Sequence, residues 1–521
     1  MGYNYSQIDH DNSTWFLSDN SKATLLGINL VGGCLRSLNK FEVEFKYPIS
    51  VIAGKNGSGK STLLALVACA FHNYKNGFRL PDRDIPYYTF SDFLIQSKEE
   101  ISPEGIFISY KILYNKWKPS DRIPTGEGIG SQTISKKVGG KWSKYSRRVN
   151  RNVVYFGIDR VVPHSEKSVS KSYRNHFKKG ETSGWEKAVK DIVGKILNKD
   201  YDEFWYYKHK KYQLPLVKVR DNTYSGFNMG AGENALFKIF STIFSCPEGA
   251  LFVIDEIELG LHEEAQILLI GELKKICTKK HIQIVCTTHS STIINKLPPE
   301  ARLFVENIGS KTIVTSGISS LYAAGKMAGE NSNELDIFVE DDTAKNLIEI
   351  ALSNETRLRV NFLVIGSSSA VTRQLTARYK NIKKGECIAI LDGDKSTKNE
   401  SLYHNFLNML ESVDDKDAAE SYIKDRLKFL PGITWPEKWI FLEIKQKYVA
   451  ELAAELSIDE TSLNDYLDNS IRAGKHKEFY TMSKKTNLNV SSIKTLFCKS
   501  AVKCNKDEFR EIERSILNFL E

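Results

Sequence analysis

The sequence predicts an α/β protein with two units built on parallel sheets, followed by a helical region. Strand-like and helix-like apolar segments alternate in two separate series, one between residues 23 and 290 and another that starts near residue 334. The chain has 521 residues, more than one hydrophobic core usually supports, so we expect two or three domains. Its composition, 41% hydrophobic and 26% charged, excludes a disordered chain, a collagen-like fibre and a disulfide-stabilised miniprotein.

The first series begins with strand-like segments that lead into a glycine-rich turn. Residues 23–54 alternate and then run apolar, and a helix-like apolar segment follows at residues 63–71. The strand pattern returns at residues 250–257 and 281–290 with a helix-like segment between them, which is typical of a parallel sheet covered by helices. Residues 165–222 are polar, rich in lysine and intermittently helical, so we predict an inserted helical or dimerisation arm that projects from the core.

The second series is a compact βαβαβ module, which is Rossmann-like, over residues 333–430. Strand-like segments at residues 335–340, 359–366 and 387–394 alternate with helix-like ones. Residues 431–521 have a helical pattern, and the chain contains no repeat of fixed period. We therefore expect a second α/β domain with a helical C-terminal part.

A phosphate-binding motif lies in the first series. The stretch GKNGSGKS matches G-x-x-x-x-G-K-[ST] between a strand and a helix, which is the context that the motif requires. Its glycines let backbone N–H groups surround a phosphate, Lys60 reaches the β and γ phosphates, and Ser61 binds Mg²⁺. We expect ATP and Mg²⁺ to bind at Gly54, Asn56, Gly57, Ser58, Gly59, Lys60, Ser61 and Thr62.

Other parts of a nucleotide hydrolase follow in order along the chain. Asp255 ends an apolar strand and suits the water shell of Mg²⁺, and Glu256 suits a base that orients the attacking water. After the next apolar strand, His289 is placed to sense the γ phosphate. Upstream, a glycine turn opens a predicted helix and offers a second anion-binding helix start, at Gly230, Gly232 and Glu233.

Together and in this order, these segments resemble the ABC-type P-loop ATPases. The resemblance implies a signature loop, a Walker B strand with catalytic Glu256, a D-loop-like stretch over residues 258–262, and a switch histidine at His289. It also implies that Gln96 contacts the nucleotide as the Q-loop glutamine. In that family the signature loop of one subunit completes the ATP site of another. Since the chain carries one such set, the resemblance implies a homodimer or larger even oligomer formed through an ATPase domain over residues 1–325.

Three carboxylates end strands of the second series. Glu340 follows its first strand, and Asp392 and Asp394 follow its third. Because the carboxyl ends of parallel strands meet at one edge of a sheet, we expect these side chains to share Mg²⁺ or Mn²⁺. The alternatives are a solvated D-x-D loop and a glutamate that only caps a helix.

A glutamate after strand one and D-x-D after strand three resemble the Toprim fold. An ABC-type ATPase followed by Toprim resembles the OLD (overcoming lysogenization defect) nucleases, which include the Gabija nuclease subunit and retron-associated anti-phage effectors. The resemblance implies that Glu340, Asp392 and Asp394 are catalytic metal ligands and that Glu437 is a further ligand.

The sequence departs from the pattern of these nucleases at one position. They carry a second acid four residues after the glutamate, where this chain has Ala344. Asp341, Asp342 and Glu437 are the residues that can replace it. The number of metal ions therefore stays open, and we expect one tightly held ion unless such a replacement occurs.

A basic segment over residues 136–151 has seven lysines and arginines, no acid, and Trp142 and Tyr145 between them. Such a segment can follow a phosphate backbone and offer rings to bases, although a solvated loop is the alternative. The run over residues 208–211 is a lesser candidate. The predicted nucleic-acid contacts are Lys136, Lys137, Lys141, Lys144, Arg147 and Arg148.

The net charge and the cysteine content indicate which partners and which cellular compartment to expect. Lysine and arginine number 73 against 64 acids, a net charge of +9 that allows a polyanionic partner. The eight cysteines include no C-x-x-C pair, and no stretch is typical of a secretion signal or a membrane span. We therefore expect a reduced, cytoplasmic protein without a membrane partner.

These features predict an ATP-regulated, divalent-metal-dependent endonuclease that cleaves nucleic acid, with DNA favoured. The resemblance implies an effector of bacterial anti-phage defence with a partner, such as a retron reverse transcriptase with its RNA–DNA or another accessory protein. One alternative is a non-cleaving RecF- or SMC-like ATPase scaffold whose Toprim module only binds. Another is a toxin nuclease directed against RNA or tRNA, because a metal-bound phosphodiester looks alike in DNA and RNA.

Overall fold

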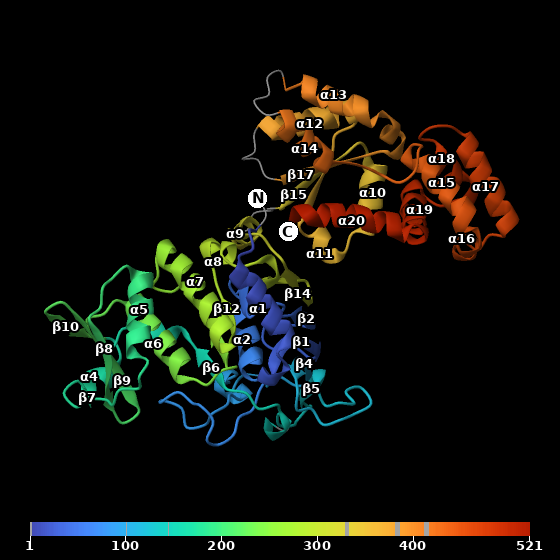
Figure 1. Cartoon of the computed structure of the whole chain (residues 1–521). Helices are drawn as coiled ribbons and strands as arrows, with labels where there is room; N and C mark the ends of the chain where they lie inside the picture. Colours follow the sequence, from blue (N-terminus) through green and yellow to red (C-terminus); the bar gives the residue numbers. More distant parts are fainter. Residues whose placement is uncertain are drawn as a thin grey trace. The chain divides into compact units, whose positions relative to one another are not determined.

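The structure is a computed structural model that describes residues 3–100, 102–143, 145–328, 333–380, 386–410 and 416–520. The chain divides into two compact units, Tyr3–Glu330 and Asn331–Glu521 (Figure 1). Each unit contains a sheet with parallel strands and has its own hydrophobic core. The two predicted strand–helix series therefore correspond to two separate units.

A six-stranded sheet organises the first unit. In spatial order its strands are β14 (Lys311–Ser316), β13 (Arg302–Ile308), β3 (Ile49–Ala53), β12 (Gln283–Thr287), β11 (Leu251–Ile254) and β6 (Val153–Phe156). All neighbours pair in parallel except β13 with β14. Every residue of β3, β11 and β12 is buried, as expected for strands covered on both faces. The parallel sheet predicted for the first series is confirmed.

Helices α2 (Lys60–Ala68), α6 (Ala231–Ser245) and α7 (Glu263–Lys280) contribute buried apolar side chains to the core of this unit. A second, antiparallel sheet has the order β2 (Phe41–Glu44), β1 (Thr24–Gly32), β4 (Ile106–Tyr114) and β5 (Gly128–Lys136). The remaining α-helices of the core are α1 (Gln7–Ser18), α3 (Phe90–Phe93), α8 (Ser291–Asn295) and α9 (Ser320–Ala328). The short 3₁₀ turns are η1 (Asn20–Lys22), η2 (Tyr145–Arg147), η3 (Ile158–Val161) and η4 (Pro299–Ala301).

The arm predicted as helical over residues 165–222 contains both helices and a β-sheet. It contains α4 (Ser168–Ser172), β7 (Lys178–Lys179), α5 (Glu186–Leu197), β8 (Glu203–His209), β9 (Tyr212–Val219) and β10 (Asn222–Ser225). The strands form an antiparallel sheet in the order β10-β9-β8-β7, at the end of the first unit away from β1 and β5 (Figure 1). The helical part of the prediction is present as α5, whereas the strands were missed because the high lysine content hid a run of aromatic and branched residues that favours strands.

The second unit has a four-stranded, fully parallel sheet. In spatial order its strands are β16 (Val360–Val364), β15 (Leu335–Val339), β17 (Glu386–Leu391) and β18 (Leu427–Phe429). Helices α12 (Ser368–Lys380), α13 (Asn399–Asn408) and α14 (Lys416–Arg426) share a core with one face of this sheet. Helices α10 (Asp342–Ala351), α15 (Pro436–Lys447), α19 (Val490–Cys504) and α20 (Lys506–Leu520) share a core with the other. The C-terminal helices are therefore part of the second unit.

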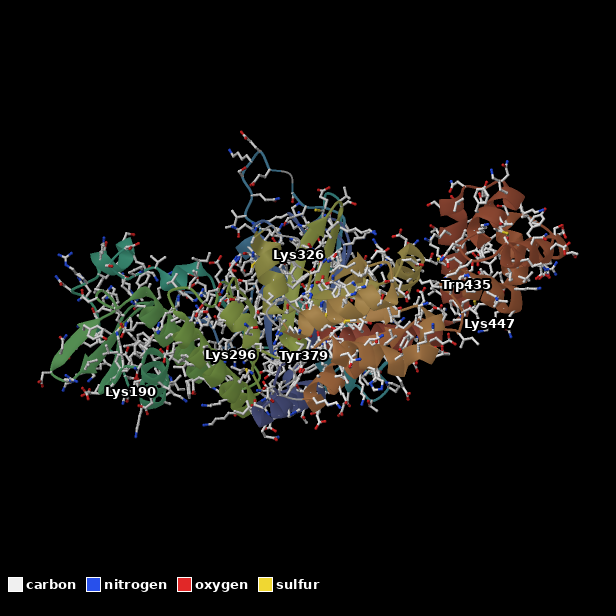
Figure 2. The ribbon with its side chains drawn as sticks, turned by 90° about the horizontal axis from the view of Figure 1, so that it is seen from above. Lys190, Lys296, Lys326, Tyr379, Trp435 and Lys447 are labelled. Carbon is white, nitrogen blue, oxygen red and sulfur yellow. The ribbon has the colours of Figure 1, made fainter. Side chains whose placement is uncertain are left out.

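Helix α15 links the sheet to the last helices. Trp435 and Lys447, labelled in Figure 2, stand at its two ends, and Trp439 and Ile440 lie in the core with strand residues. The other helical elements of this unit are α11 (Asn354–Arg357), η6 (Gly393–Lys398), α16 (Val449–Leu456), α17 (Glu460–Arg472) and α18 (Glu478–Thr486). Within the described ranges, no helix combines the length and the apolar character needed to cross a bilayer.

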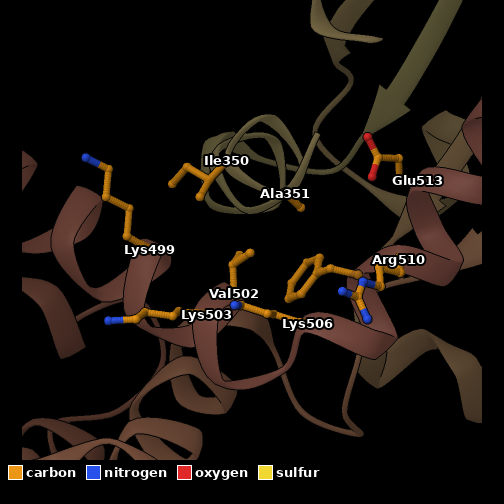
Figure 3. A pocket seen from close by; sticks show the side chains of 9 residues that line it. Ile350, Ala351, Lys499, Val502, Lys503, Lys506, Arg510 and Glu513 are labelled. Carbon is orange, nitrogen blue, oxygen red and sulfur yellow. The ribbon is translucent and has the colours of Figure 1, made fainter. Parts of the chain in front are cut away.

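A hollow of about 310 Å³ lies between α10, α19 and α20 (Figure 3). Its floor is apolar, with Ile350 and Val502, and Lys499 and Lys503 line its rim. Glu513 and the Asp507-paired Arg510 interrupt this basic rim. The hollow is therefore of mixed charge and does not define a polyanion site.

Candidate functional site

The predicted phosphate loop connects β3 to α2. Gly54, Gly57 and Gly59 have φ values of +156°, +79° and +100°, a region that favours glycine. A Cβ at Gly54 would come within 2.4 Å of the Val305 carbonyl oxygen, and one at Gly59 within 2.3 Å of Leu38. A Cβ at Gly57 would meet no atom within 4 Å. Gly54 and Gly59 are therefore required, because a side chain at either position would collide with neighbouring atoms. Gly57 has open space beside it, where a phosphate can approach the loop.

Lys60 spans this loop. Its ammonium donates hydrogen bonds to the carbonyl oxygens of Gly54, at 2.8 Å, and Lys55, at 3.1 Å. Burial lowers the pKa of Lys60, and nearby carboxylates act in the opposite direction. Among the other predicted contacts, the structure exposes Asn56 and Ser61, buries Thr62, and leaves the buried Ser58 hydroxyl without a partner among the described residues.

Asp255 and Ser61 meet at the carboxyl end of the sheet. The Ser61 hydroxyl donates to Asp255 Oδ2 at 3.2 Å, although the two residues come from distant parts of the chain. The Thr287 hydroxyl donates to the other carboxylate oxygen, Oδ1, at 2.6 Å. A serine hydroxyl beside a carboxylate fits the ligand preference of Mg²⁺. Thr287 carries no motif signal, so sequence reasoning missed it.

The backbone at Glu256 is held in an unusual conformation. Its φ is +48°, and its N–H donates to the Thr287 hydroxyl at 2.7 Å. The guanidinium of Arg160, which is only 2% exposed, donates to the carbonyl oxygens of Asp255 and Glu256. Arg160 therefore fixes the segment that presents the Glu256 carboxylate. An isolated arginine that binds carbonyl groups leaves no pattern in the sequence.

His289 follows β12, as predicted, and its side chain is exposed. Glu258 positions this loop, because its carboxylate accepts the His289 N–H at 2.5 Å and the Thr288 hydroxyl at 2.8 Å. The stretch that resembles a D-loop therefore supports the segment that carries the histidine.

The predicted signature loop begins α6. Gly230 is its exposed N-terminal cap residue, and a Cβ there would meet no atom within 4 Å. Gly232 is buried, and a Cβ on it would approach the Gly260 carbonyl oxygen to 2.1 Å. The first glycine is therefore free to face a ligand, and the second packs against the backbone of the same unit.

Glu233 does not reach the exposed face of this loop, contrary to the expectation that it contacts nucleotide. Its carboxylate is buried and accepts hydrogen bonds from the hydroxyls of Tyr201 and Tyr224, with Lys199 at 3.5 Å. These partners belong to the arm, so Glu233 ties the arm to α6. Gln96 lies in an exposed segment after α3, and its assignment stays a prediction.

A second candidate site lies at the carboxyl edge of the parallel sheet in the second unit. Glu340 follows β15, and Glu340 Oε1 accepts the backbone N–H of Asp392, which follows β17, at 3.1 Å. Both side chains are buried, and burial is the largest cause that raises the pKa of Glu340. Asp394 Oδ2 accepts a hydrogen bond from Lys395 at 2.8 Å. The predicted convergence of the three carboxylates is present in the structure.

Two further carboxylates join these three. Burial, followed by the charges of Glu340, Asp341, Asp394 and Glu437, raises the pKa of Asp392 to about 8. We refer to Glu340, Asp341, Asp392, Asp394 and Glu437 as the carboxylate cluster. Three of its oxygens are buried without a partner among the described residues, namely Asp392 Oδ1, Asp394 Oδ1 and Glu437 Oε2.

Glu437 enters the cluster from the start of α15. Its Oε1 accepts the Thr343 hydroxyl at 2.9 Å and lies 3.4 Å from His476 Nδ1. Ligand atoms of Asp341, Glu437 and His476 lie within 4.8 Å of one another. Ala344 is fully buried in the apolar core, so it offers no place for a charged ligand. Asp341 and Glu437 are the acids near the site, and Asp342 is exposed.

A family model of AAA domains matches part of the first unit. Residues 140–295 match the family model described as AAA domain, putative AbiEii toxin, Type IV TA system. The matched stretch contains Gly230, Asp255, Glu256 and His289 but not the phosphate loop. No curated protein sequence matches the chain. The first unit has a P-loop ATPase fold, which supports ATP hydrolysis.

Solved structures with detectable similarity include two SMC heads and part of an OLD protein. The SMC head domain from Thermotoga maritima is 13% identical, with a TM-score of 0.33, and the match covers 56% of this chain and 98% of that chain. An SmcHead bound to the C-winged helix domain of ScpA is 16% identical, with a TM-score of 0.36 and coverages of 56% and 97%. The C-terminal region of the Xanthomonas campestris pv. campestris OLD protein is 13% identical, with a TM-score of 0.24 and coverages of 36% and 94%. At these scores, the three structures assign no residue of the chain.

The basic segment predicted to contact nucleic acid is partly internal. Arg148 is 5% exposed and donates to the carbonyl oxygens of Cys69 and Tyr88, so its assignment as a nucleic-acid contact was wrong. Trp142 stacks on Phe90 with ring centroids 4.0 Å apart.

The other residues of this segment divide into two groups. The Tyr145 hydroxyl accepts the N–H of Phe90, and Lys136 donates to the Ser102 hydroxyl. Lys137, Lys141 and Arg147 are exposed, and Lys144 lies outside the described residues. Exposed cations remain, whereas Trp142 and Tyr145 are only partly exposed and both contact Phe90.

Proposed function

We propose that the protein is an ATP-regulated, divalent-metal-dependent endonuclease that hydrolyses phosphodiester bonds in nucleic acid, with DNA favoured. The observation that carries this proposal is the carboxylate cluster at the carboxyl edge of a parallel sheet. The order of its acids, a glutamate after β15 and D-x-D after β17, is the order that resembles Toprim. Such an edge is where α/β sheets commonly bind ligands.

The cluster fits a divalent cation. Five acids with three unpartnered buried oxygens are unfavourable without more counter-charge than that of Lys395, which contacts Asp394, and the raised pKa of Asp392, about 8, reflects burial and that repulsion. Glu340, Asp392 and Asp394 would hold Mg²⁺ or Mn²⁺, with Glu437 as a further ligand. When bound, the ion lowers the pKa of a water molecule and stabilises negative charge on the phosphate.

A backbone N–H group and two side chains hold these carboxylates in place and offset part of their negative charge. The Asp392 N–H holds one oxygen of Glu340, which keeps the two carboxylates together before any ion binds. The Lys395 ammonium, 2.8 Å from Asp394 Oδ2, offers a positive charge beside the site for a substrate phosphate. Thr343 orients Glu437, so that its unpartnered oxygen remains available to the cluster.

The ATPase unit is proposed to control cleavage through subunit contact. Lys60 and Ser61 would bind the phosphates and Mg²⁺, Asp255 would hold the water shell of that ion, and Glu256 would orient the attacking water. Gly230 is exposed at the start of a 15-residue helix, a suitable donor surface for a phosphate held by another subunit. A homodimer or larger even oligomer follows from this arrangement. The resemblance to OLD nucleases supports a role in anti-phage defence with an accessory partner, such as a retron reverse transcriptase with its RNA–DNA.

The test is cleavage of plasmid DNA and of structured RNA by the purified protein with Mg²⁺ or Mn²⁺. Glu340→Gln, which keeps the side-chain shape, should lower cleavage by about 100-fold or more, because the ion loses a charged ligand. ATP hydrolysis should stay within about twofold of the parent, because the nucleotide site is formed by other residues. Asp342→Asn is the matched control, since it removes an exposed charge close by.

Each outcome of this test separates the candidate functions. Metal-dependent cleavage that is lost in Glu340→Gln and kept in Asp342→Asn supports the nuclease. ATP hydrolysis without any metal-dependent cleavage supports the scaffold alternative and rejects the nuclease. Cleavage of RNA alone supports the toxin alternative.

A further inference from the structure

The outer part of the arm carries a dense positive charge. Residues 168–180 and 204–213 contain no Asp or Glu. All of their lysines and arginines are exposed, and none forms an ion pair with a described residue. We refer to these cations as the arm surface: Lys171, Arg174, Lys178, Lys179, Lys208, Lys210 and Lys211.

Aromatic rings lie among these cations. The Tyr173 ring lies 4.5 Å from His209 and 5.9 Å from Tyr212, with the second pair stacked. The Lys210 ammonium lies 5.5 Å from the centroid of the Tyr173 ring. All three rings are partly exposed, although Tyr173 and Tyr212 each also pack against the small hydrophobic core of the arm. The arm surface therefore combines charge with aromatic faces, the combination that binds unpaired bases and their phosphates.

The backbone holds two of the lysines opposite each other. Lys178 of β7 is the register partner of Lys208 of β8. Like charges that face each other directly across a strand pair destabilise it. A phosphate between the two ammonium groups would convert this repulsion into attraction.

The turn that joins β8 to β9 is also locally unfavourable, in both its residue types and its backbone conformation. It consists of Lys210 and Lys211, where Asn-Gly or a similar pair is preferred. Lys210 has a φ of +50°, in the left-handed region that side chains other than Gly, Asn and Asp disfavour. Lysine at this position adds charge to the arm surface at the expense of local stability, a combination that is typical of functional sites.

We propose that the arm surface binds single-stranded nucleic acid, with phosphates on its lysines and bases on Tyr173 and Tyr212. An unpaired strand is favoured over a duplex because only unstacked bases can reach the rings. The surface lies outside the carboxylate cluster and the phosphate loop, so binding requires neither metal nor ATP. The inference therefore stands whether or not the protein cleaves nucleic acid.

Fluorescence anisotropy with the full chain in EDTA tests this proposal. The probes are labelled oligo-dT, oligo-U and a DNA duplex, each of about 20 nucleotides per strand. The triple variant Lys178→Ala/Lys179→Ala/Lys210→Ala should bind the single strands at least about tenfold more weakly. The slope of the logarithm of its binding constant against the logarithm of the salt concentration should be smaller in magnitude by about 2, because three phosphate contacts are lost. The tighter of the two single strands identifies the natural chemistry as DNA or RNA.

Matched variants separate charge from stacking. Lys75→Ala/Lys98→Ala/Lys279→Ala removes three exposed lysines elsewhere in the same unit, and its affinity should stay near the parent value. Tyr173→Leu should weaken binding about threefold to thirtyfold and leave the salt dependence of the affinity unchanged. Tyr173→Phe, which keeps an aromatic ring, should bind with an affinity near that of the parent. ATP hydrolysis and the thermal midpoint of each variant show that it is folded.

Three results would overturn the proposal. The first is unchanged binding by the arm triple variant, and the second is an equal loss in the control triple variant. The third is a pair of observations: poly-glutamate displaces the labelled strand as well as unlabelled oligo-dT does, and Tyr173→Leu leaves the affinity unchanged. That result would identify the arm surface as a binding site for an acidic protein.

Discussion

The backbone N–H of Asp392 donates a hydrogen bond to Glu340 Oε1 at 3.1 Å, which joins the ends of two neighbouring strands through a backbone group and a carboxylate. This contact satisfies one oxygen of Glu340 but none of the Asp392 carboxylate, whose Oδ1 is buried without a partner among the described residues. A bound cation would therefore stabilise the ionised carboxylate of Asp392 more than that of Glu340.

The first prediction is a pH-dependent stability of the metal-free protein. The pKa of Asp392 is raised from 3.8 to about 8 by burial and neighbouring acids, so the folded chain binds a proton there that the unfolded chain lacks between these values. Stability from this group is therefore full below about pH 4 and lost as the pH rises through about 8. In EDTA, the thermal midpoint should fall between about pH 6 and pH 9, and Mn²⁺ should restore it.

Asp392→Asn isolates this effect. An amide cannot ionise, so the variant should be more stable than the parent by at least about 1 kcal/mol in EDTA near pH 9. Asp342→Asn, which changes an exposed acid nearby, should follow the parent profile. A parent midpoint that rises steadily over this pH range would contradict the assigned shift.

The second prediction separates nucleotide binding from hydrolysis. Lys60→Ala should lose ATP binding, because the ammonium that reaches the phosphates is absent. Glu256→Gln should bind ATP and hydrolyse it at least about 100-fold more slowly, because the amide does not orient the attacking water as a base does. Filter binding with labelled ATP and phosphate release measure the two steps. Parent-like hydrolysis by Glu256→Gln would exclude this residue as the catalytic glutamate.

Contiguous motifs were predictable because their function requires a fixed local conformation. The phosphate loop is one such motif, and the pairing of Glu340 with Asp392 followed from the rule that parallel strands end at one edge. Arg160 and Thr287 were not predictable, because they act through backbone carbonyl groups and a hydroxyl brought near by the fold. Arg148 was misassigned because local charge does not reveal burial.

The third prediction concerns an ATP site shared between subunits. Gly230→Glu places a negative charge on an exposed helix start, where it should repel a phosphate held by another subunit. Mixing this variant with Lys60→Ala should restore part of the ATPase rate, because both defects can fall in one site of a mixed dimer and leave the other intact. Gly232 is unsuitable for this test, because any side chain there would collide with the Gly260 backbone.

Light scattering and a matched variant complete this experiment. Gly271→Glu changes a glycine that also has open space around it, on a helix outside the predicted interface, and should leave the rate unchanged. Full activity of a protein that stays monomeric at the assay concentration would rule out the shared site.

The fourth prediction assigns Arg148 to stability. Its guanidinium donates to three carbonyl oxygens, those of Cys69, Tyr88 and Tyr145. Arg148→Ala should lower the free energy of unfolding by about 2 to 4 kcal/mol, because these buried acceptors lose their partner. Arg147→Ala, which changes an exposed neighbour, should have little effect in the same denaturant titration. A loss of nucleic-acid affinity without a loss of stability in Arg148→Ala would reverse this assignment.

The last prediction concerns metal number. Glu340, Asp392 and Asp394 form the predicted site, and the position where the resemblance to OLD nucleases implies a further acid is the buried Ala344. Asp341 is the nearest replacement, but its Oδ1 already accepts the N–H groups of Thr343 and Ala344 as a helix cap. One tightly held ion is therefore expected.

A second ion has a weaker set of ligands available. Glu437, with one unpartnered oxygen, and His476 lie beside Asp341, and a site with an imidazole accepts Mn²⁺ more readily than Mg²⁺. Substrate phosphate would add the oxygens that complete its coordination. Calorimetry with Mn²⁺ should thus show one strong site and a second at least about tenfold weaker.

Two variants distinguish the sites. His476→Ala should remove the weak Mn²⁺ site and keep the strong one, whereas Asp394→Asn should weaken the strong one because it removes a charged ligand. Anomalous scattering from substrate-free crystals soaked in Mn²⁺ gives the positions directly. Two fully occupied ions there would contradict the expected difference in affinity. No ion beside Glu340 would remove the basis for metal-dependent cleavage altogether.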